Sequence, residues 1–220
     1  WSSPVICNSL ALLMIKSVVF DIGAVLVDWN PRYLYRDLMK DEAEVERFLS
    51  EVCSFDWNHS LDLGRDWEEA KAERVALFPH YEEMIEAYWQ RWLEMFSGPI
   101  HESVDILMDL KRRGYPDYAL SNWNDVKWDI AVQEFPFLRL FDGQIISGQV
   151  KLAKPDPAIY DLLIKTYSLN PRESLFIDDR IENVQAALNA GLHAVQFTSP
   201  RQLERDLIQF GLIPDGGNDE

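Results

Sequence analysis

The stretch Ser17-Val18-Val19-Phe20-Asp21-Ile22-Gly23 decides the fold of this chain, because a short apolar run ends there at a carboxylate and a glycine. A continuous run of β-branched and aromatic residues is typical of a parallel strand that is buried on both faces. We therefore predict a central strand over residues 16–20. Asp21 then lies at the carboxyl end of that strand, where open α/β sheets bind their ligands.

Three later polar motifs lie near the ends of further apolar runs, and they carry the same kind of chemistry. They are Ser121-Asn122, Lys154-Pro155 and Asp178-Asp179. A carboxylate, a hydroxyl, an ammonium and a carboxylate pair are the groups that metal-assisted phosphoryl transfer needs. We predict that Asp21 is the nucleophile and that Ser121 and Lys154 hold the phosphoryl oxygens. Turn-forming roles would explain each motif singly, but not all of them in this order.

Beyond Pro99 the chain alternates between helical and strand-like segments. Asp156 before Pro157 has the residue types of a helix N-cap and a first helical position, and Gly114 and Gly191 each follow a helical pattern. This alternation predicts an α/β fold with a doubly wound parallel sheet. The predicted helices cover 104–113, 157–165, 181–190 and 201–210, and the predicted strands cover 118–120, 175–177 and 193–197.

Residues 31–98 contain no strand-like run and repeat apolar residues at a spacing of three to four positions. The repeat over 84–96 is typical of a helix with one buried face. Breaks at Asn30-Pro31 and Ser97-Gly98-Pro99 bound the region. We therefore predict an all-helical insert over 31–98, with 14–30 and 99–213 forming the core.

These motifs, in this order, resemble the haloacid dehalogenase superfamily of phosphatases and dehalogenases, and the resemblance runs from about Met14 to about Leu212. It implies a Rossmann-like core with a helical cap over 31–98. It also implies a Mg²⁺-dependent phosphatase that hydrolyses a small phosphorylated metabolite, such as a sugar phosphate. In that chemistry the carboxylate of Asp21 attacks phosphorus, and water hydrolyses the resulting aspartyl-phosphate.

Gly23 departs from this resemblance, because most phosphatases of the superfamily carry a second aspartate there as general acid and base. Some members similar to glucose-1-phosphatase share the glycine, so activity is still expected. Losing a positioned acid typically costs on the order of 10²–10⁴-fold in rate. Asp28 is near enough in sequence to replace it, although an N-cap or hinge role is the more common one. A weak or inactive protein that binds a phosphorylated ligand or a protein is an alternative.

The pair Asp178-Asp179 bears on the reaction class, because Mg²⁺ prefers hard oxygen ligands and keeps several waters. The resemblance implies Asp21, the carbonyl of Gly23 and Asp178 as direct ligands, with Asp179 direct or through water. True haloacid dehalogenases need no metal and lose part of this acidic pair. The pair therefore favours a phosphatase over the other enzyme alternative, a metal-independent 2-haloacid dehalogenase. Asn183 either orients Asp178 or Lys154, or is an ordinary first-turn residue.

Residues 55–65 are predicted to be the least helical part of the cap and contain Gly64, as does the specificity loop of similar caps. His59 and Arg65 are candidates to recognise a sugar or a second anionic group, and Trp57 is a candidate to stack on it. A place in the core of the cap is the more common role for a tryptophan. Ser121, Asn122 and Lys154 are the predicted contacts of the phosphoryl group.

Composition narrows the range of partners. With 21 basic and 37 acidic side chains the net charge is 21 − 37 = −16, which argues against nucleic acid and against an anionic membrane surface. The two cysteines, Cys7 and Cys53, form no CxxC motif and fit a reducing, cytoplasmic compartment. We expect a small phosphorylated metabolite as ligand and a monomer or homodimer.

The first thirteen residues are interpreted separately. Their apolar part, Val5 to Ile15, is too short to span a bilayer and lacks the basic start and cleavage site of a signal peptide. Met14 directly precedes the first strand. We therefore expect residues 1–13 to be a leader or an added run, with a short native arm as the alternative.

Overall fold

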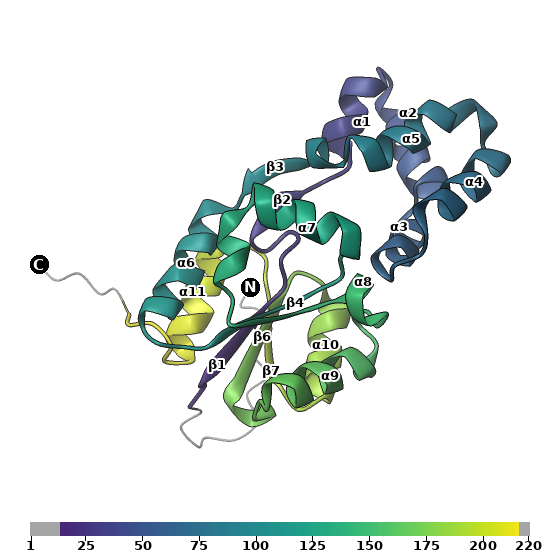
Figure 1. The fold of residues 1–220 in the computed structure, drawn as a ribbon. Helices are drawn as coiled ribbons and strands as arrows, with labels where there is room; N and C mark the ends of the chain where they lie inside the picture. The colour runs from purple at the N-terminus through teal and green to yellow at the C-terminus, as the bar shows by residue number, and fades with distance from the viewer. Residues whose placement is uncertain (1–13, 216–220) are drawn as a thin grey trace, which may run out of the picture.

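The computed structural model describes residues 14–215, so the expectation for residues 1–13 lies outside the described part (Figure 1). A five-stranded parallel sheet forms its centre, in the order β5-β4-β1-β6-β7. Its strands are β1 (Ser17–Phe20), β4 (Asp117–Ser121), β5 (Gly143–Ile146), β6 (Ser174–Asp178) and β7 (His193–Gln196). The predicted α/β fold with a parallel sheet is confirmed.

The central strand β1 pairs with a strand on either side, so that Val19 lies opposite Tyr118 of β4 and Phe176 of β6. All four of its residues are buried, as the uninterrupted apolar run predicted. From β1 the chain continues to β4 and β5 on one side and later to β6 and β7 on the other. The order of the strands therefore reverses at β1, which is where ligand sites form in such sheets.

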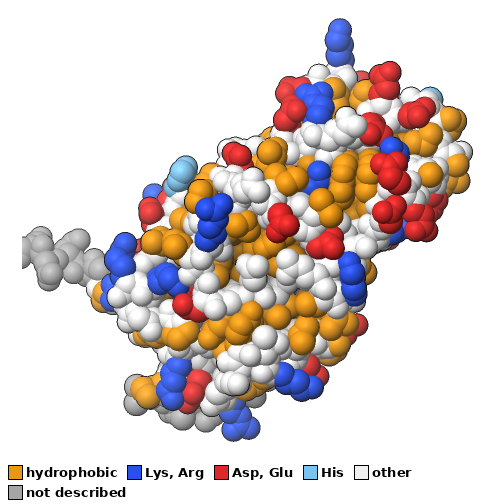
Figure 2. Space-filling model, viewed as in Figure 1, with side chains coloured by type: hydrophobic (Ala, Val, Ile, Leu, Met, Phe, Trp, Pro, Cys, Tyr) orange, Lys and Arg blue, Asp and Glu red, His pale blue; other side chains and the backbone are white. Residues whose placement is uncertain are grey.

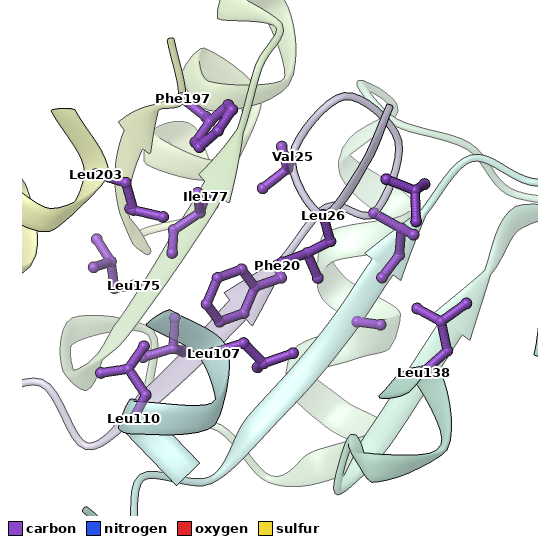
Figure 3. Packing of buried hydrophobic residues seen from close by; sticks show 14 of the residues in the cluster. Phe20, Val25, Leu26, Leu107, Leu110, Leu138, Leu175, Ile177, Phe197 and Leu203 are labelled. Carbon is purple, nitrogen blue, oxygen red and sulfur yellow. The ribbon is translucent and has the colours of Figure 1, made fainter. Parts of the chain in front are cut away.

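Helices cover both faces of the sheet, because successive side chains of a strand point to opposite faces. Phe20 packs into one hydrophobic cluster with Leu107, Leu110 and Leu203 (Figure 3). Val19 packs into another cluster on the opposite face. The first cluster includes α6 (His101–Arg112), α7 (Asp125–Glu134) and α11 (Pro200–Gln209), and the second includes α9 (Pro157–Tyr167) and α10 (Ile181–Asn189) (Figure 1).

A second, helical part extends from the sheet and has its own core of Tyr35, Phe48, Trp57, Ile85 and other apolar residues. It is joined to the sheet by β2 (Val27–Trp29) and β3 (Phe96–Pro99), which pair antiparallel. Its helices are α1 (Arg32–Leu38), α2 (Glu42–Arg47), α3 (Phe55–Asp62), α4 (Trp67–Leu77) and α5 (Glu82–Gln90), with short turns of other helix types at Phe48–Val52, Pro79–Tyr81 and Trp92–Met95. We call this part the cap. Its division from the core at 30/31 and 98/99 stays a prediction.

The surface of the cap is strongly charged. Figure 2 shows red acidic side chains gathered over much of its visible face, with basic side chains among them. Several acidic side chains of the cap are paired with arginine at the surface, for example Glu46 with Arg32 and Glu42 with Arg36. Exposed ion pairs contribute little to the stability of the fold. We therefore interpret the acidic side chains of the cap mainly as solvated surface groups.

The structure corrects the prediction for residues 55–65. They are not the least helical part of the cap, because α3 runs over Phe55–Asp62 and only the following turn is irregular. The hydroxyl of Ser54 caps the helix by accepting from the backbone N–H of Trp57 at 3.4 Å. Trp57 and Leu61, four positions apart, bury the same face in the cap core. Gly64 then takes a φ of +83°, which favours glycine.

Most of the remaining core elements agree with the sequence. Helix α9 has Asp156 as its N-cap, whose carboxylate accepts from the backbone N–H of Ala158 at 2.8 Å, as predicted. Strand β5 and helix α7 were not predicted, because β5 is short and half polar and α7 has no clear apolar stripe. Within residues 14–215 no helix is both long and apolar enough to cross a membrane.

The clusters against the sheet carry a stability prediction. Replacing Leu110, which is fully buried in α6, by alanine should lower the free energy of unfolding by about 2–5 kcal/mol, because it leaves a cavity against the sheet. Urea denaturation of the purified variant measures the change. The control is Leu140→Ala, since Leu140 is 40% exposed. Equal losses from the two substitutions would contradict the assigned packing.

Candidate active site at the carboxyl edge of the sheet

The three neighbouring strands β4, β1 and β6 bring the predicted site residues together. Asp21 follows β1 directly, Ser121 is the last residue of β4, and Asp178 is the last residue of β6. Because the strands are parallel, residues far apart in the sequence become neighbours at each end of the sheet. Asp21 lies beside Ser121, which is 100 positions away, at the carboxyl end. Ser17 lies beside Ser174, which is 157 positions away, at the opposite end. Lys154 comes from the segment before α9 and reaches the same edge as Asp21.

Lys154 forms the centre of this site. Its Nζ lies 2.9 Å from Oδ1 of Asp21 and 2.7 Å from Oδ2 of Asp178. Lys154 is only 2% exposed and Asp178 is fully buried. Burial works against the charge of Lys154, but Asp178 and Asp21 outweigh it and raise the pKa of the ammonium. The lysine is therefore held as a cation between two acids.

The two carboxylate oxygens of Asp21 have different surroundings. Oδ1 accepts from Ser121 Oγ at 3.0 Å and from the backbone N–H of Ile22 at 2.7 Å, and it contacts Lys154. Among the described residues no hydrogen bond to Oδ2 is found, and Asp21 keeps 8% of its surface exposed. One oxygen therefore fixes the carboxylate, and the other stays available to react.

Burial raises the pKa of Asp21 to about 7, while the Lys154 ammonium opposes the shift and the charge of Asp178 adds to it. Burial and the charge of Asp178 also raise the pKa of Asp179. The site thus concentrates more negative charge than one lysine neutralises. A bound cation would stabilise the ionised form of all three acids.

The same three acids have the arrangement of a metal site. One carboxylate oxygen from each of Asp21, Asp178 and Asp179 lies within 4.8 Å of the others. Such hard, anionic oxygens are the ligands that divalent cations of the magnesium and calcium type prefer. The residues present therefore fit a divalent cation.

Two asparagines support the charged residues. The side chain of Asn183 donates to both oxygens of Asp178, at 2.9 and 3.0 Å, so it orients this carboxylate. Asn122 donates to the carbonyl of Lys154 at 2.9 Å and accepts from its backbone N–H at 2.8 Å. Asn122 thus holds the backbone that carries the lysine. It also lines a cavity beside the site, where its predicted contact with a substrate stays a prediction.

This cavity lies between the carboxyl edge of the sheet and the cap. Four aromatic side chains form one part of its wall: Trp29, Trp92, Phe96 and Trp123. The other lining residues are Gly23, Asn58, Asp62, Asn122, Asn124 and Lys127. The Nζ of Lys127 lies 4.1 Å from the ring centre of Trp89 and donates to its carbonyl at 2.7 Å. Burial lowers the pKa of Lys127 to about 8.

The cap residues predicted to contact the substrate do not gather at the cavity. Trp57 is only 2% exposed and packs edge-to-face against Trp67 and Tyr88, so it has no free face for a ligand and its predicted stacking role is wrong. Arg65 pairs with Glu73 and lies 3.7 Å from Glu69, outside the cavity lining. A substrate contact of Arg65 in this arrangement would require that pairing to break.

His59 lies on α3 and is influenced by the positive charge of Arg180, the residue that follows Asp178 and Asp179. Burial lowers the pKa of its imidazole, and the positive charge of Arg180 lowers it further. Arg180 itself stacks over the ring of Phe55 at 4.2 Å, which links the start of α3 to the loop after Asp179. The predicted substrate contact of His59 stays a prediction.

The sequence predicted residues 55–65 as a substrate-recognition loop but did not single out Asp62 within it, and no motif indicated Asn124 or Lys127 as residues of the cavity. Asp62 is one of 37 acidic side chains and belongs to no recognisable pattern. Only the packing of α3 onto the core identifies it. Asn124 is of a residue type that favours helix N-caps, and its side chain does cap α7 by accepting from the backbone N–H of Lys127 at 3.2 Å, but this type does not indicate a place in the cavity.

Comparison with known proteins identifies the class to which this fold and site belong. The family model of haloacid dehalogenase-like hydrolases matches residues 15–191. The chain belongs to this family, and the predicted fold and family are confirmed.

Individual relatives add detail about the family. The chain is 28% identical to a D-ribitol-5-phosphate phosphatase of Bacteroides thetaiotaomicron over 83% of its length and 92% of that protein. It is 26% identical to a sesquiterpene phosphatase of Aspergillus oryzae, over 83% and 90% of the two chains. A solved family enzyme from Bacteroides thetaiotaomicron, in complex with magnesium and inorganic phosphate, superimposes with a TM-score of 0.66 at 23% identity, covering 84% of this chain and 95% of that one.

The buried position of Lys154 carries a stability prediction. Lys154→Met should lower the free energy of unfolding by about 3–5 kcal/mol, because it leaves two buried acids without their cation. Urea denaturation without divalent cations measures the change. The matched control is Lys165→Met, at an exposed position of α9. A loss no larger than that of the control would show that Lys154 is not the counter-charge of the two acids.

Proposed function

We propose that this protein is a Mg²⁺-dependent phosphomonoesterase that hydrolyses a small phosphorylated metabolite through an aspartyl-phosphate intermediate. The observation that carries the proposal is the convergence of Asp21, Ser121, Lys154 and Asp178 at one edge of the sheet. A nucleophile, a hydroxyl donor, a cation and a metal-binding acid are the parts that this reaction needs.

In the proposed reaction the free oxygen of Asp21, Oδ2, attacks phosphorus. The hydroxyl of Ser121 and the ammonium of Lys154 already lie at Oδ1, where they orient the carboxylate. Both groups are donors, so they also suit the oxygens of a phosphoryl group bound beside Asp21. Lys154 thereby reduces the repulsion between an anionic nucleophile and an anionic substrate.

Asp21, the carbonyl of Gly23, Asp178 and Asp179 are the proposed ligands of Mg²⁺. The close approach of the three carboxylates supports this set. When bound, the ion would neutralise charge on the phosphoryl oxygens and on the acids, as a Lewis acid. Asn183 would hold Asp178 in place for it, as outer-shell partners of metal ligands do.

The cavity supports a small hydroxylated substrate. The amides of Asn58, Asn122 and Asn124 line it, and amides exchange hydrogen bonds with hydroxyl groups. Trp92 and Trp123 line it as well and offer apolar surface to a carbon chain or a sugar ring. A relative of this chain is named for ribitol 5-phosphate, which has this chemistry. We therefore propose a polyol or sugar phosphate as the substrate class.

The nucleophile provides the first test. Asp21→Asn should lower phosphatase activity by more than about 10³-fold while the fold is kept, because an amide has nearly the same shape but does not attack phosphorus. The assay measures phosphate release from ribitol 5-phosphate and p-nitrophenyl phosphate with Mg²⁺. Asp161→Asn, at an exposed position of α9, is the matched control.

Two results would contradict the proposed function. One is an Asp21→Asn variant that keeps the rate of the unchanged protein. The other is halide release from 2-chloropropionate without a divalent cation, together with no hydrolysis of phosphate esters. The latter result would identify a haloacid dehalogenase.

The metal ligands provide a second test. Asp178→Asn should raise the Mg²⁺ concentration needed for half-maximal activity by about 10-fold or more, because a neutral amide replaces a buried anionic ligand. A Mg²⁺ titration at saturating substrate measures it, with Asp129→Asn on the exposed face of α7 as control. An unchanged titration curve would remove Asp178 from the ligand set.

A further inference from the structure

The core of the proposed phosphatase places no second carboxyl group beside the nucleophile to donate a proton, because position 23 is a glycine. When a P–O bond to an alcohol breaks, the leaving oxygen becomes a strongly basic alkoxide unless it receives a proton. Gly23 has no side chain that could supply one. Asp28, a candidate by sequence, accepts from the hydroxyl of Tyr33 at 2.8 Å and does not line the cavity.

We infer, resting on the proposed function, that Asp62 of the cap is the general acid that protonates the leaving group. Asp62 is the last residue of α3, and it lines the same cavity as Gly23 and Asn122. Among the described residues that line this cavity, it is the only one with a carboxyl group. It is also near enough to Asp21 for the two charges to interact.

The core holds the end of α3 in this place. The hydroxyl of Ser147 donates to the carbonyl of Asp62 at 2.6 Å, and the amide of Asn124 donates to the carbonyl of Leu61 at 2.8 Å. The backbones approach closely just beyond, since a Cβ atom added to Gly64 would lie 3.0 Å from the carbonyl oxygen of Gly148. The backbone of Asp62 is therefore anchored to the catalytic core, although Asp62 belongs to the cap.

The side chain of Asp62 is oriented as well. Asn58 donates from Nδ2 to Oδ2 of Asp62 at 2.9 Å, and the hydroxyl of Tyr88 donates to Oδ1 of Asn58 at 2.8 Å. The bond from Tyr88 fixes which end of the Asn58 amide faces Asp62. This arrangement leaves Oδ1 of Asp62 to carry the proton.

The surroundings of Asp62 also favour its protonated form. Burial raises the pKa of this carboxyl well above its usual range, the bond from Asn58 opposes the shift, and the charge of Asp21 adds to it. General acid catalysis needs a group whose protonated form is favoured, and a raised pKa acts in that direction. The geometry and the charge state thus point to the same role.

Gly23 leaves room for the leaving group. A Cβ atom added there would meet nothing within 4 Å, so the space beside the glycine is open to the cavity. Gly23 is also not one of the glycines with a positive φ, so its backbone does not require glycine. Absence of a side chain at this position provides space rather than a special conformation.

Protons and bonds balance over the two steps of the reaction. As Oδ2 of Asp21 bonds to phosphorus, the ester P–O bond breaks and the leaving oxygen takes the proton of Asp62, so that an alcohol departs and Asp62 becomes a carboxylate. Water then attacks the phosphorus of the aspartyl-phosphate and gives one proton to Asp62. The bond between Asp21 and phosphorus breaks, inorganic phosphate is released, and both acids return to their initial states.

Asp62→Asn tests the inference, because the amide keeps the shape and the partner Asn58 but carries no acidic proton. The measurement is kcat/KM, which covers the steps through cleavage of the ester bond, for ribitol 5-phosphate and for p-nitrophenyl phosphate. We expect a loss of about 10²-fold or more on the alkyl ester and little change on the aryl ester, whose leaving group needs no proton. Asp56→Asn, an exposed acid on the same helix, is the matched control and should change neither value.

The aryl ester also reports on folding, because a misfolded variant loses both activities. Two results would overturn the role of Asp62: an equal loss on the two esters in an Asp62→Asn variant that is still folded, or no loss on the alkyl ester. The proposed function would remain intact in either case, provided that Asp21→Asn still abolishes activity. Absence of any phosphatase activity in the unchanged protein would overturn both.

A rescue experiment provides a second measurement. Gly23→Asp places a carboxyl in the open space beside the nucleophile, and it should restore at least about 10-fold of the alkyl ester activity that Asp62→Asn loses. In the variant that carries both Gly23→Asp and Asp62→Asn, activity restored on the alkyl ester alone would support the assignment of Asp62 as the proton donor. Restoration on both esters to the same degree would instead indicate a change in binding, and would count against the inference.

Discussion

The active site depends on the placement of one buried ammonium group between two buried acids. Lys154 contacts Asp21 and Asp178, which end neighbouring strands, and without it the edge of the sheet would hold uncompensated negative charge. Asn122 holds the backbone of Lys154 by hydrogen bonds to both its N–H and its carbonyl. The electrostatics of the site and the order of the strands therefore depend on each other. The sheet brings the acids close together, and the ammonium of Lys154 compensates part of their negative charge.

Residues of the core could be predicted from the sequence because they lie at the ends of periodic segments. Asp21, Ser121 and Asp178 each follow or end an apolar run, and parallel strands end together, so the sequence alone implies that these three residues meet. Strand β5 escaped prediction because its side of the sheet offers only a short mixed run. The exact contacts of Lys154 also escaped, since its loop has no period.

Cap residues were harder to predict, for a physical reason. Trp57 and Asp62 lie on one helix five positions apart, yet the first is buried in the cap core and the second lines the cavity. The sequence offered Trp57 as a candidate ligand contact, beside the more common role of a tryptophan in the cap core, and did not single out Asp62. The packing of α3, which is set by tertiary contacts with Asn124 and Ser147, decides otherwise. Those partners lie more than sixty positions away, so the local sequence of α3 does not indicate which of its side chains face the cavity.

Helix α3 serves both the shape of the cavity and the proposed chemistry. Asn58 and Asp62 share one turn of it, so a substitution that reshapes this wall for a different metabolite also displaces the proposed proton donor. Asp21, the proposed nucleophile, follows the central strand in the core and is not displaced by such changes. In descendants of this protein, substrate range and leaving-group preference should therefore diverge together, by changes in the cap, while the core chemistry stays constant.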